Sequence, residues 1–390
     1  MTHPFRDVAI AGVWNTEQAR TLEGRDSLSL AVEGALGALT DAGIGIEEVD
    51  GVAGQFAAEM VLGARMGPCS RKLSTHGIPT VLEAASMIAF GECEVVVIGA
   101  GGAAMYTERS STAPWTRPSN ELVVGYGLFT AAEFALMARR HMLQYGTTRE
   151  QLALAAATVR NNGHVNPEAV YVGRGPFTTD DILESRMVAD PFHLLECSMT
   201  SEGGCGLVLT TAARALDGAT KPVWILGGAG DTYGPAYVVP PVWNLRGRAG
   251  RGDDIPAGYV GRRAARKSFG LAGLGPSDVD VAEFYDPFSF EIIRQLEAYE
   301  FCGEGEGGPF VEAGHIGPDG SVPVTTDGGT MSFSHAGLNV QMLQRVIRGV
   351  QQVRGTCATT QIDGAEVAMC SNGGSGALFT DVMLLGSSRP

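Results

Sequence analysis

The sequence predicts a layered α/β fold that is built from two similar halves. Residues 42–50 and 272–280 carry the same phrase, in which Ala-Gly and an aliphatic residue are followed by a short turn and then Val-Asp. A second correspondence links 91–99 with 364–369, where a glycine and an acidic residue lead into an apolar run. Each copy has the pattern of a helix end, a turn and a buried strand. We therefore expect a duplicated domain whose halves pack about a pseudo-two-fold axis.

The first half, residues 1–227, is expected to alternate strands and helices. Continuous apolar runs are typical of parallel strands covered on both faces, and apolar stripes at helical spacing are typical of amphipathic helices. The expected elements are strand 8–12, helix 27–42 with Ser27 as a possible cap, strand 49–54, helix 77–90, strand 94–99, and strands 206–210 and 222–227.

An inserted helical loop subdomain is expected at about 103–200. Residues 103–125 break the alternation with Ser, Thr, Pro and Gly, and two helices are expected after them, at 129–145 and 149–162. The segment Thr147-Thr148-Arg149-Glu150 resembles a capping box at the start of the second helix.

The second half, residues 228–390, repeats the alternation. Its expected elements are helix 257–271, strand 279–284, helix 288–300, a loop rich in Gly and Glu, helix 336–350, and strands 366–370 and 377–384. This order favours helices layered on mixed sheets.

Composition and charge restrict the class of protein. The 390 residues are 44% hydrophobic, which is enough for two cores. The formal net charge of −15 argues against nucleic acid or anionic lipid as a partner. Apolar runs fall short of the roughly 20 residues that a membrane helix needs, so no membrane span is expected. The amino terminus does not resemble a signal peptide, so we expect a cytoplasmic protein.

The spacing of the cysteines bears on disulfides and metal sites, and the spacing of the basic residues bears on anion binding. The seven cysteines are irregularly spaced without a C-x-x-C pair, so we expect no disulfide framework and no metal site. Basic residues are concentrated in 246–267, at Arg246, Arg248, Arg251, Arg262, Arg263, Arg266 and Lys267. This segment is either a local anion site or a solvated helix face.

Four short motifs occur in a characteristic order. They are Ser74-Thr75-His76-Gly77; Glu283-Phe284-Tyr285-Asp286-Pro287-Phe288; Gly328-Gly329 followed by His335-Ala336-Gly337; and Cys370-Ser371-Asn372-Gly373-Gly374-Ser375-Gly376. In this order and spacing they resemble the thiolase superfamily over nearly the whole chain, and more closely its lipid-transfer or sterol-carrier thiolase-like branch. The resemblance implies a thiolase-like fold with a layered αβαβα arrangement.

The resemblance puts Ser74 where thiolases carry their nucleophilic cysteine. That cysteine lies at a helix N-terminus, where the helix dipole lowers the thiol pKa and favours attack on a thioester. A serine hydroxyl needs a strong neighbouring base to act in the same way, and His76 is the candidate. The alternative is that Ser74 is only an N-cap.

Three further residues match the family's active site. His335 matches the histidine that donates to the thioester oxygen, and Cys370 matches the cysteine that moves a proton at the α-carbon. Tyr285 lies where related aldolases of steroid side chains have a tyrosine thought to take part in proton transfer, although those aldolases also tend to have tyrosine in place of His335. Asn372 replaces a glycine whose amide joins the oxyanion hole, and its own backbone amide could serve. The alternatives are that His335 is a surface or core-satisfied histidine, that Cys370 is a buried cysteine at a strand end, and that Tyr285 is a buried aromatic residue with a satisfied hydroxyl.

Because the expected nucleophile is missing, we favour retro-aldol cleavage of a β-hydroxyacyl-CoA without an acyl-enzyme. This class of substrate includes thioesters with a steroid or other bulky side chain. In this hypothesis Tyr285 takes the hydroxyl proton, His335 stabilises the thioester oxygen and Cys370 acts at the α-carbon. One alternative is a thiolase-like acyltransferase working in a complex, with Ser74 or a partner's residue as nucleophile. Another is a non-catalytic subunit that binds acyl-CoA or lipid.

The resemblance also implies ligands and partners. Coenzyme A enters as part of the substrate, with no covalently bound cofactor, and Arg246, Arg262 and Arg263 are candidate contacts for its phosphates. A homodimer is expected, as is a small partner protein of zinc-ribbon and OB-fold type that would hold any zinc.

Overall fold

The computed structural model describes residues 3–54, 56–72, 77–103, 130–232, 259–374 and 379–390. Within these residues, nine strands form one mixed sheet in the order β3-β2-β4-β7-β1-β8-β11-β10-β9. The strands are β1 (Val8–Asn15), β2 (Gly51–Ala53), β3 (Ser70–Lys72), β4 (Val95–Gly102), β7 (Gly203–Thr211), β8 (Val223–Thr232), β9 (Val281–Glu283), β10 (Val367–Gly374) and β11 (Phe379–Gly386). Strand β2 is parallel to β3 and β4, and β9 is parallel to β10, whereas the other neighbours are antiparallel.

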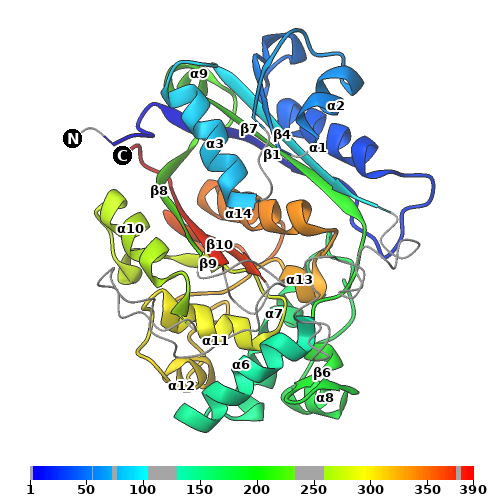
Figure 1. The fold of residues 1–390 in the computed structure, drawn as a ribbon, viewed down its shortest axis with the longest axis vertical. Helices are drawn as coiled ribbons and strands as arrows, with labels where there is room; N and C mark the ends of the chain where they lie inside the picture. Colours follow the sequence, from blue (N-terminus) through cyan, green and yellow to red (C-terminus); the bar gives the residue numbers. More distant parts are fainter. Residues whose placement is uncertain (1–2, 55, 73–76, 104–129, 233–258, 375–378) are drawn as a thin grey trace.

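The sheet has two parts that meet where β1 pairs briefly with β8, at Ala9–Trp224 and Ile10–Val223. Helices α3 (Gly77–Ala89) and α14 (Leu338–Arg354) lie between the two parts and pack against each other. Helix α1 (Ser27–Ala42) covers the outer face of β1, β4 and β7, and α10 (Arg262–Ala272) covers the outer face of β8 and β11. Figure 1 shows this succession of helix, sheet, helix, sheet and helix. The predicted layered fold is confirmed.

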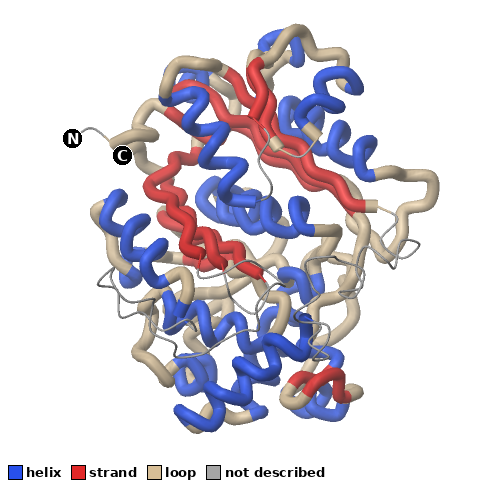
Figure 2. The backbone as a smooth tube through the Cα atoms, in the orientation of Figure 1, coloured by secondary structure: helices blue, strands red, loops and turns tan. Residues whose placement is uncertain are grey.

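The inserted subdomain lies at one end of the molecule, where Figure 2 shows mostly helices. Its elements are α6 (Thr130–Tyr145), α7 (Arg149–Val165), α8 (Thr179–Glu184) and the small hairpin of β5 (Met187–Ala189) and β6 (Phe192–His193). Helix α7 packs against α11 (Ser289–Ala298), α12 (Gly307–Glu312) and α13 (Gly329–Ser332) of the second half. Two short helices, α2 (Ala57–Gly63) and α9 (Ala212–Asp217), complete the set in the described residues.

The sequence repeat corresponds to a structural repeat. Gly43 ends α1 and Gly273 ends α10, both in the left-handed region at φ 67° and 69°. A short 3-10 turn follows each glycine, at Ile46–Glu48 and Pro276–Asp278. Asp50 and Asp280 then lead into the equivalent strands β2 and β9. Duplication of a helix, turn and strand is therefore confirmed.

Some predicted boundaries differ from the structure. Helix α1 spans the predicted residues, but its N-cap is Asp26 rather than Ser27, because the Asp26 carboxylate accepts from Ser29 N at 2.7 Å. Strand β8 runs through residues 227 and 228, where the two halves were divided. The capping box of α7 pairs Thr148 with Gln151. No helix in the described part of the chain is long and apolar enough to cross a membrane.

Candidate functional site

Tyr285 lies beside the first turn of α14, in the loop that follows β9. The residue is 7% exposed, and its hydroxyl oxygen accepts a hydrogen bond from Nε2 of Gln341 at 3.4 Å. Gln341 is itself buried, and within the described part of the chain its Oε1 has no hydrogen-bond partner. The end of β9 and the start of α14 therefore meet at a polar spot inside the molecule.

His335 lies just before α14, between that helix and α13. Its Nδ1 is 2.6 Å from the carbonyl oxygen of Met199, and its backbone N–H donates to Oγ of Ser201 at 2.8 Å. A carbonyl oxygen can only accept, so Nδ1 must carry the proton of the neutral ring. Burial lowers the pKa of His335 to about 4. At neutral pH the ring is therefore uncharged, and Nε2 presents a lone pair.

This tautomer bears on the predicted role of His335. Donation from His335 to a thioester oxygen requires a proton on Nε2, which the neutral ring bound to Met199 lacks. The arrangement instead makes Nε2 an acceptor, which is the form that a base needs.

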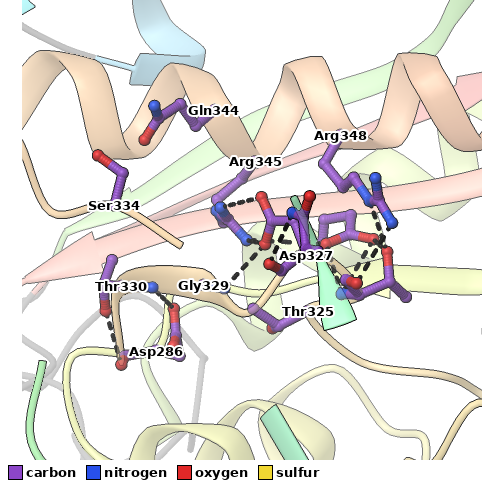
Figure 3. A network of polar contacts seen from close by, with 12 residues as sticks. Asp286, Thr325, Asp327, Gly329, Thr330, Ser334, Gln344, Arg345 and Arg348 are labelled. Carbon is purple, nitrogen blue, oxygen red and sulfur yellow. Dashed lines mark hydrogen bonds and ion pairs between the residues drawn. The ribbon is translucent and has the colours of Figure 1, made fainter. Parts of the chain in front are cut away.

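A buried polar network joins the Tyr285 loop to the segment that leads to His335, as Figure 3 shows. The carboxylate of Asp286 accepts from Thr330 N at 2.7 Å and Met331 N at 3.2 Å, and the hydroxyl of Thr330 donates to the backbone oxygen of Asp286. Asp286 is fully buried, and burial raises its pKa to about 7. The network thus fixes the loop after β9 against α13.

Arg345 of α14 stabilises the same network with charge (Figure 3). Its guanidinium forms two hydrogen bonds with Asp327, at 2.7 and 2.6 Å, and lies 3.7 Å from the carboxylate of Glu283. All three residues are buried, and burial raises the pKa of Glu283 to about 7. Nearby, Ser334 and Gln344 both donate to Oε1 of Gln18, which connects α14 to the first half.

Cys370 packs further along α14 than the contact between Gln341 and Tyr285. It is fully buried in β10, and burial raises the pKa of its thiol well above the ordinary value. Its sulfur packs against Gly349, because a Cβ on that glycine would lie 2.6 Å from the sulfur. Gly349 comes 11 residues after the start of α14, and a rise of 1.5 Å per residue puts it about 16 Å along the helix. Cys370 therefore contacts α14 about two turns beyond Gln341, the residue that contacts Tyr285.

Asn372 is the residue of β10 that reaches the start of α3. Its Nδ2 is 3.4 Å from Sδ of Met342, and a Cβ on Gly77 would lie 2.6 Å from the same nitrogen. Side chains alternate along a strand, so Cys370 and Asn372 share one face, with Asn372 one pleat closer to the helix starts. The sequence analysis considered only the backbone amide of Asn372.

Asp381, the partner of Asn372 on β11, was not predicted from the sequence. Nδ2 of Asn372 donates to Oδ2 of Asp381 at 3.2 Å. Burial raises the pKa of Asp381 to about 7, and the hydrogen bond from Asn372 opposes that rise. The available signal was a lone carboxylate in strand 379–385, in which the other residues except Thr380 are apolar.

The remaining predicted residues fall into two groups. Ser74, His76 and Arg246 lie outside the described residues. Arg262 pairs with Glu304 at 2.6 Å and lies over the ring of Tyr259, and Arg263 pairs with Asp231 at 2.8 Å. Their side chains are 10% and 41% exposed, so Arg263 is the more accessible of the two.

The chain is similar to known proteins over nearly its full length. Residues 254–387 match the family described as Thiolase C-terminal domain-like. The chain is 32% identical to an acetyl-CoA acetyltransferase of Methanothermobacter thermautotrophicus, covering 95% of this chain and 97% of the relative. It is 31% identical to the 17-hydroxy-3-oxo-4-pregnene-20-carboxyl-CoA lyase of Mycobacterium tuberculosis, covering 94% and 96%. It is 30% identical to a steroid side-chain-cleaving aldolase of Thermomonospora curvata, covering 98% of each.

Solved structures agree with these likenesses. An Ltp2-ChsH2(DUF35) aldolase superposes with a TM-score of 0.83 at 28% identity, covering 98% of this chain and 99% of that chain. Human mitochondrial 3-ketoacyl-CoA thiolase superposes with a TM-score of 0.70 at 15% identity, covering 98% and 99%, which supports the fold alone. The chain therefore belongs to the thiolase superfamily, in the sterol-carrier thiolase-like branch that includes side-chain-cleaving aldolases.

Proposed function

We propose that the protein is a coenzyme A thioester carbon–carbon lyase that cleaves a β-hydroxyacyl-CoA by a retro-aldol reaction. The names of two full-length relatives, a carboxyl-CoA lyase and a side-chain-cleaving aldolase, support this class of reaction. The observation that carries the proposal is that an uncharged His335 and the hydroxyl of Tyr285 both lie at the start of α14. That pair supplies an acceptor nitrogen and a hydroxyl donor without any covalent step.

Retro-aldol cleavage needs a base for the β-hydroxyl proton and a donor for the thioester oxygen. We assign the base to Nε2 of His335, because its other nitrogen already donates to Met199. We assign the donor to Tyr285, because a phenol hydroxyl can donate its proton while its oxygen accepts from Gln341. These assignments exchange the roles that the sequence resemblance implied. Cys370 has no part in them, because its buried thiol lies beneath Gly349.

The acyl group is proposed to be bulky, such as a steroid side chain, following the substrates named for the two relatives. Arg246, Arg262 and Arg263 are proposed contacts for the coenzyme A phosphates. Arg263→Met, which removes the more exposed guanidinium of the two described arginines, should raise KM for a CoA thioester. It should leave KM for the matching pantetheine thioester unchanged, because that substrate lacks the nucleotide phosphates.

The test of the lyase is direct. The protein is incubated with β-hydroxyacyl-CoA thioesters, including a steroid-17-hydroxy-20-carboxyl-CoA, and the products are identified by liquid chromatography and mass spectrometry. Release of a ketone or aldehyde together with a shortened acyl-CoA is expected. Release of neither from any of these thioesters would contradict the lyase.

An acyltransferase is the second candidate, favoured by the name of the acetyl-CoA acetyltransferase relative. It requires a nucleophile, for which Ser74 is the predicted residue. Mass spectrometry of the protein after incubation with acyl-CoA separates the two reactions, because only the acyltransferase would leave an acyl group on Ser74. A protein that neither cleaves nor becomes acylated would fit a binding subunit.

The proposed assembly includes a homodimer and a small partner of zinc-ribbon and OB-fold type. The solved complex of Ltp2 with ChsH2(DUF35) supports a companion of this kind. Co-purification from the native host, followed by protein identification and zinc analysis of any companion, tests the assembly. The lyase assay is run with and without that companion.

A further inference from the structure

The polar pair Asn372 and Asp381 lies on the face of the sheet that is turned toward α3 and α14. The two residues are direct neighbours on β10 and β11 and share the 3.2 Å hydrogen bond from Nδ2 to Oδ2. Met383, two residues beyond Asp381, packs in the same core cluster as Ile78 of α3 and Val346 of α14. Because side chains two apart share a face, Asp381 also faces this helical layer.

Two glycines provide the space that this pair occupies. A Cβ on Gly77, the first residue of α3, would lie 2.6 Å from Nδ2 of Asn372. A Cβ on Gly230 of β8 would lie 2.5 Å from Oδ1 of Asp381. The pair is thus enclosed on one side by the start of α3 and on the other by β8.

Both side chains have properties of a group that acts on a ligand. Asn372 is fully buried, and its Oδ1 has no hydrogen-bond partner among the residues that the structure describes, which is costly unless a ligand supplies a donor. Asp381 is partly exposed and can exchange protons with water. Its pKa of about 7 means that both the acid and the carboxylate are populated near neutral pH.

The proposed lyase leaves one proton transfer without a residue. After the carbon–carbon bond breaks, the thioester enolate must take a proton at its α-carbon. Cys370 is buried beneath Gly349, and Nε2 of His335 is already assigned to the β-hydroxyl proton, so neither residue is assigned to the α-carbon. Asn372 lies near Tyr285 by way of α14, because its Nδ2 is 3.4 Å from Sδ of Met342, the residue after Gln341, whose amide contacts the Tyr285 hydroxyl.

We propose that Asp381, oriented by Asn372, exchanges the proton at the α-carbon of the bound thioester. In the cleavage direction the O–H bond of the Asp381 carboxyl breaks and a C–H bond forms at the α-carbon, using the electron pair of the enolate double bond. The thioester carbonyl is restored, and the carboxylate left on Asp381 regains a proton from water. The role of this step in turnover rests on the proposed lyase function.

Hydrogen exchange on a short thioester isolates this step from cleavage. Propionyl-CoA is incubated with the protein in deuterium oxide, and deuterium at the α-carbon is followed by mass spectrometry. Wild-type protein is expected to catalyse exchange. Asp381→Asn should lower the rate by about 100-fold or more, in the range by which general acid–base groups accelerate reactions. The matched control is Thr380→Val, an isosteric change on the adjacent residue, whose side chain points to the opposite face. That control should exchange at the wild-type rate.

A second variant separates chemistry from folding. Asp381→Ala should lose exchange and regain part of it when formate is added, because formate can occupy the space of the missing carboxyl. Wild-type protein without exchange, Asp381→Asn with the wild-type exchange rate, or a normally folded Asp381→Ala that formate does not restore would each overturn the proposal. Protein that exchanges α-hydrogens but cleaves no β-hydroxyacyl-CoA would contradict the lyase and support this role of Asp381.

Discussion

The backbone carbonyl of Met199 holds Nδ1 of His335 at 2.6 Å and so sets the tautomer of the ring. Because burial lowers the pKa of His335 to about 4, its Nε2 stays unprotonated well below neutral pH. We therefore predict that kcat/KM for cleavage does not fall with a pKa near 6.5, the ordinary value for histidine, as the pH is lowered. The fall that protonation of His335 causes is expected near pH 4. A pH–rate profile of the wild-type protein measures it.

The same shift predicts a contribution to stability. The unfolded chain binds the proton of His335 more readily than the folded chain, because the folded pKa lies below the ordinary value. The contribution is present above pH 6.5 and is lost as the pH falls toward 4. Urea unfolding of wild-type protein and His335→Asn at several pH values measures the difference. A difference that does not change between pH 7 and pH 4 would contradict the assigned shift.

Arg345→Met is predicted to be strongly destabilising. The substitution leaves Asp327 buried without its paired cation and removes one of the two arginines that act on Glu283, and breaking a buried ion pair in this way typically costs about 3–5 kcal/mol. Arg214→Met is the matched control, because Arg214 also contacts two carboxylates, Glu48 and Glu94, but at the surface. Its loss should cost about 0–1 kcal/mol. Urea unfolding of both variants tests this, and equal effects would contradict the importance of burial.

Gly77→Ala is predicted to disturb the start of α3. Gly77 has φ +56°, and the added Cβ would lie 2.6 Å from Nδ2 of Asn372 and 2.7 Å from Cβ of Met342. Gly91→Ala is the control, since Gly91 has φ +72° with nothing within 4 Å. It therefore carries only the backbone strain, about 1 kcal/mol. Thermal unfolding should show a larger loss for Gly77→Ala, and equal losses would exclude the contact with Asn372.

Substitution of Asp50 or of Asp280 is predicted to lower stability by similar amounts, because the two residues occupy equivalent positions in the repeat. The Asp50 carboxylate accepts from Glu94 N and Val95 N at the start of β4, and Asp280 accepts from Glu366 N and Val367 N at the start of β10. Substitution by Ala leaves two strand-end amides without this acceptor, at a cost of about 1–3 kcal/mol in either half. Denaturant unfolding of the two single variants measures the costs. A large loss at one position with none at the other would contradict equivalence.

Much of the scaffold could be predicted from sequence because its signals are local. The apolar stripe at 27–42 coincides with α1, and the repeated phrase coincides with two copies of the same helix, turn and strand. These patterns depend on neighbours within a few residues. The cap of α1 was misplaced by one residue, because Asp26 and Ser27 are both good capping residues and only the backbone conformation distinguishes them.

The site was harder to predict because its chemistry depends on distant contacts. The tautomer of His335 depends on Met199, 136 residues away. The choice between Cys370 and Asn372 depends on which pleat of β10 lies beside the start of α3. Asp381 gains its properties from burial and from Asn372 on a neighbouring strand. The order of the motifs along the chain identifies which strand and which loop carry the site residues. How deeply each side chain is buried follows only from the packed structure.

Tyr285 and Gln341 are predicted to act as one unit in cleavage. Tyr285→Phe removes the hydroxyl and keeps the ring, so it should lower kcat by about 10²–10³-fold, the usual effect of losing one oxyanion donor. Gln341→Leu removes the amide that donates to that hydroxyl and should lower kcat by a smaller factor. In the Tyr285→Phe background the Gln341 change should have little further effect, because its target is already gone. Kinetics of the two single variants and the double variant give the coupling. Effects that multiply independently would show that Gln341 does not act through Tyr285, and an unchanged kcat in Tyr285→Phe would remove the hydroxyl from the mechanism.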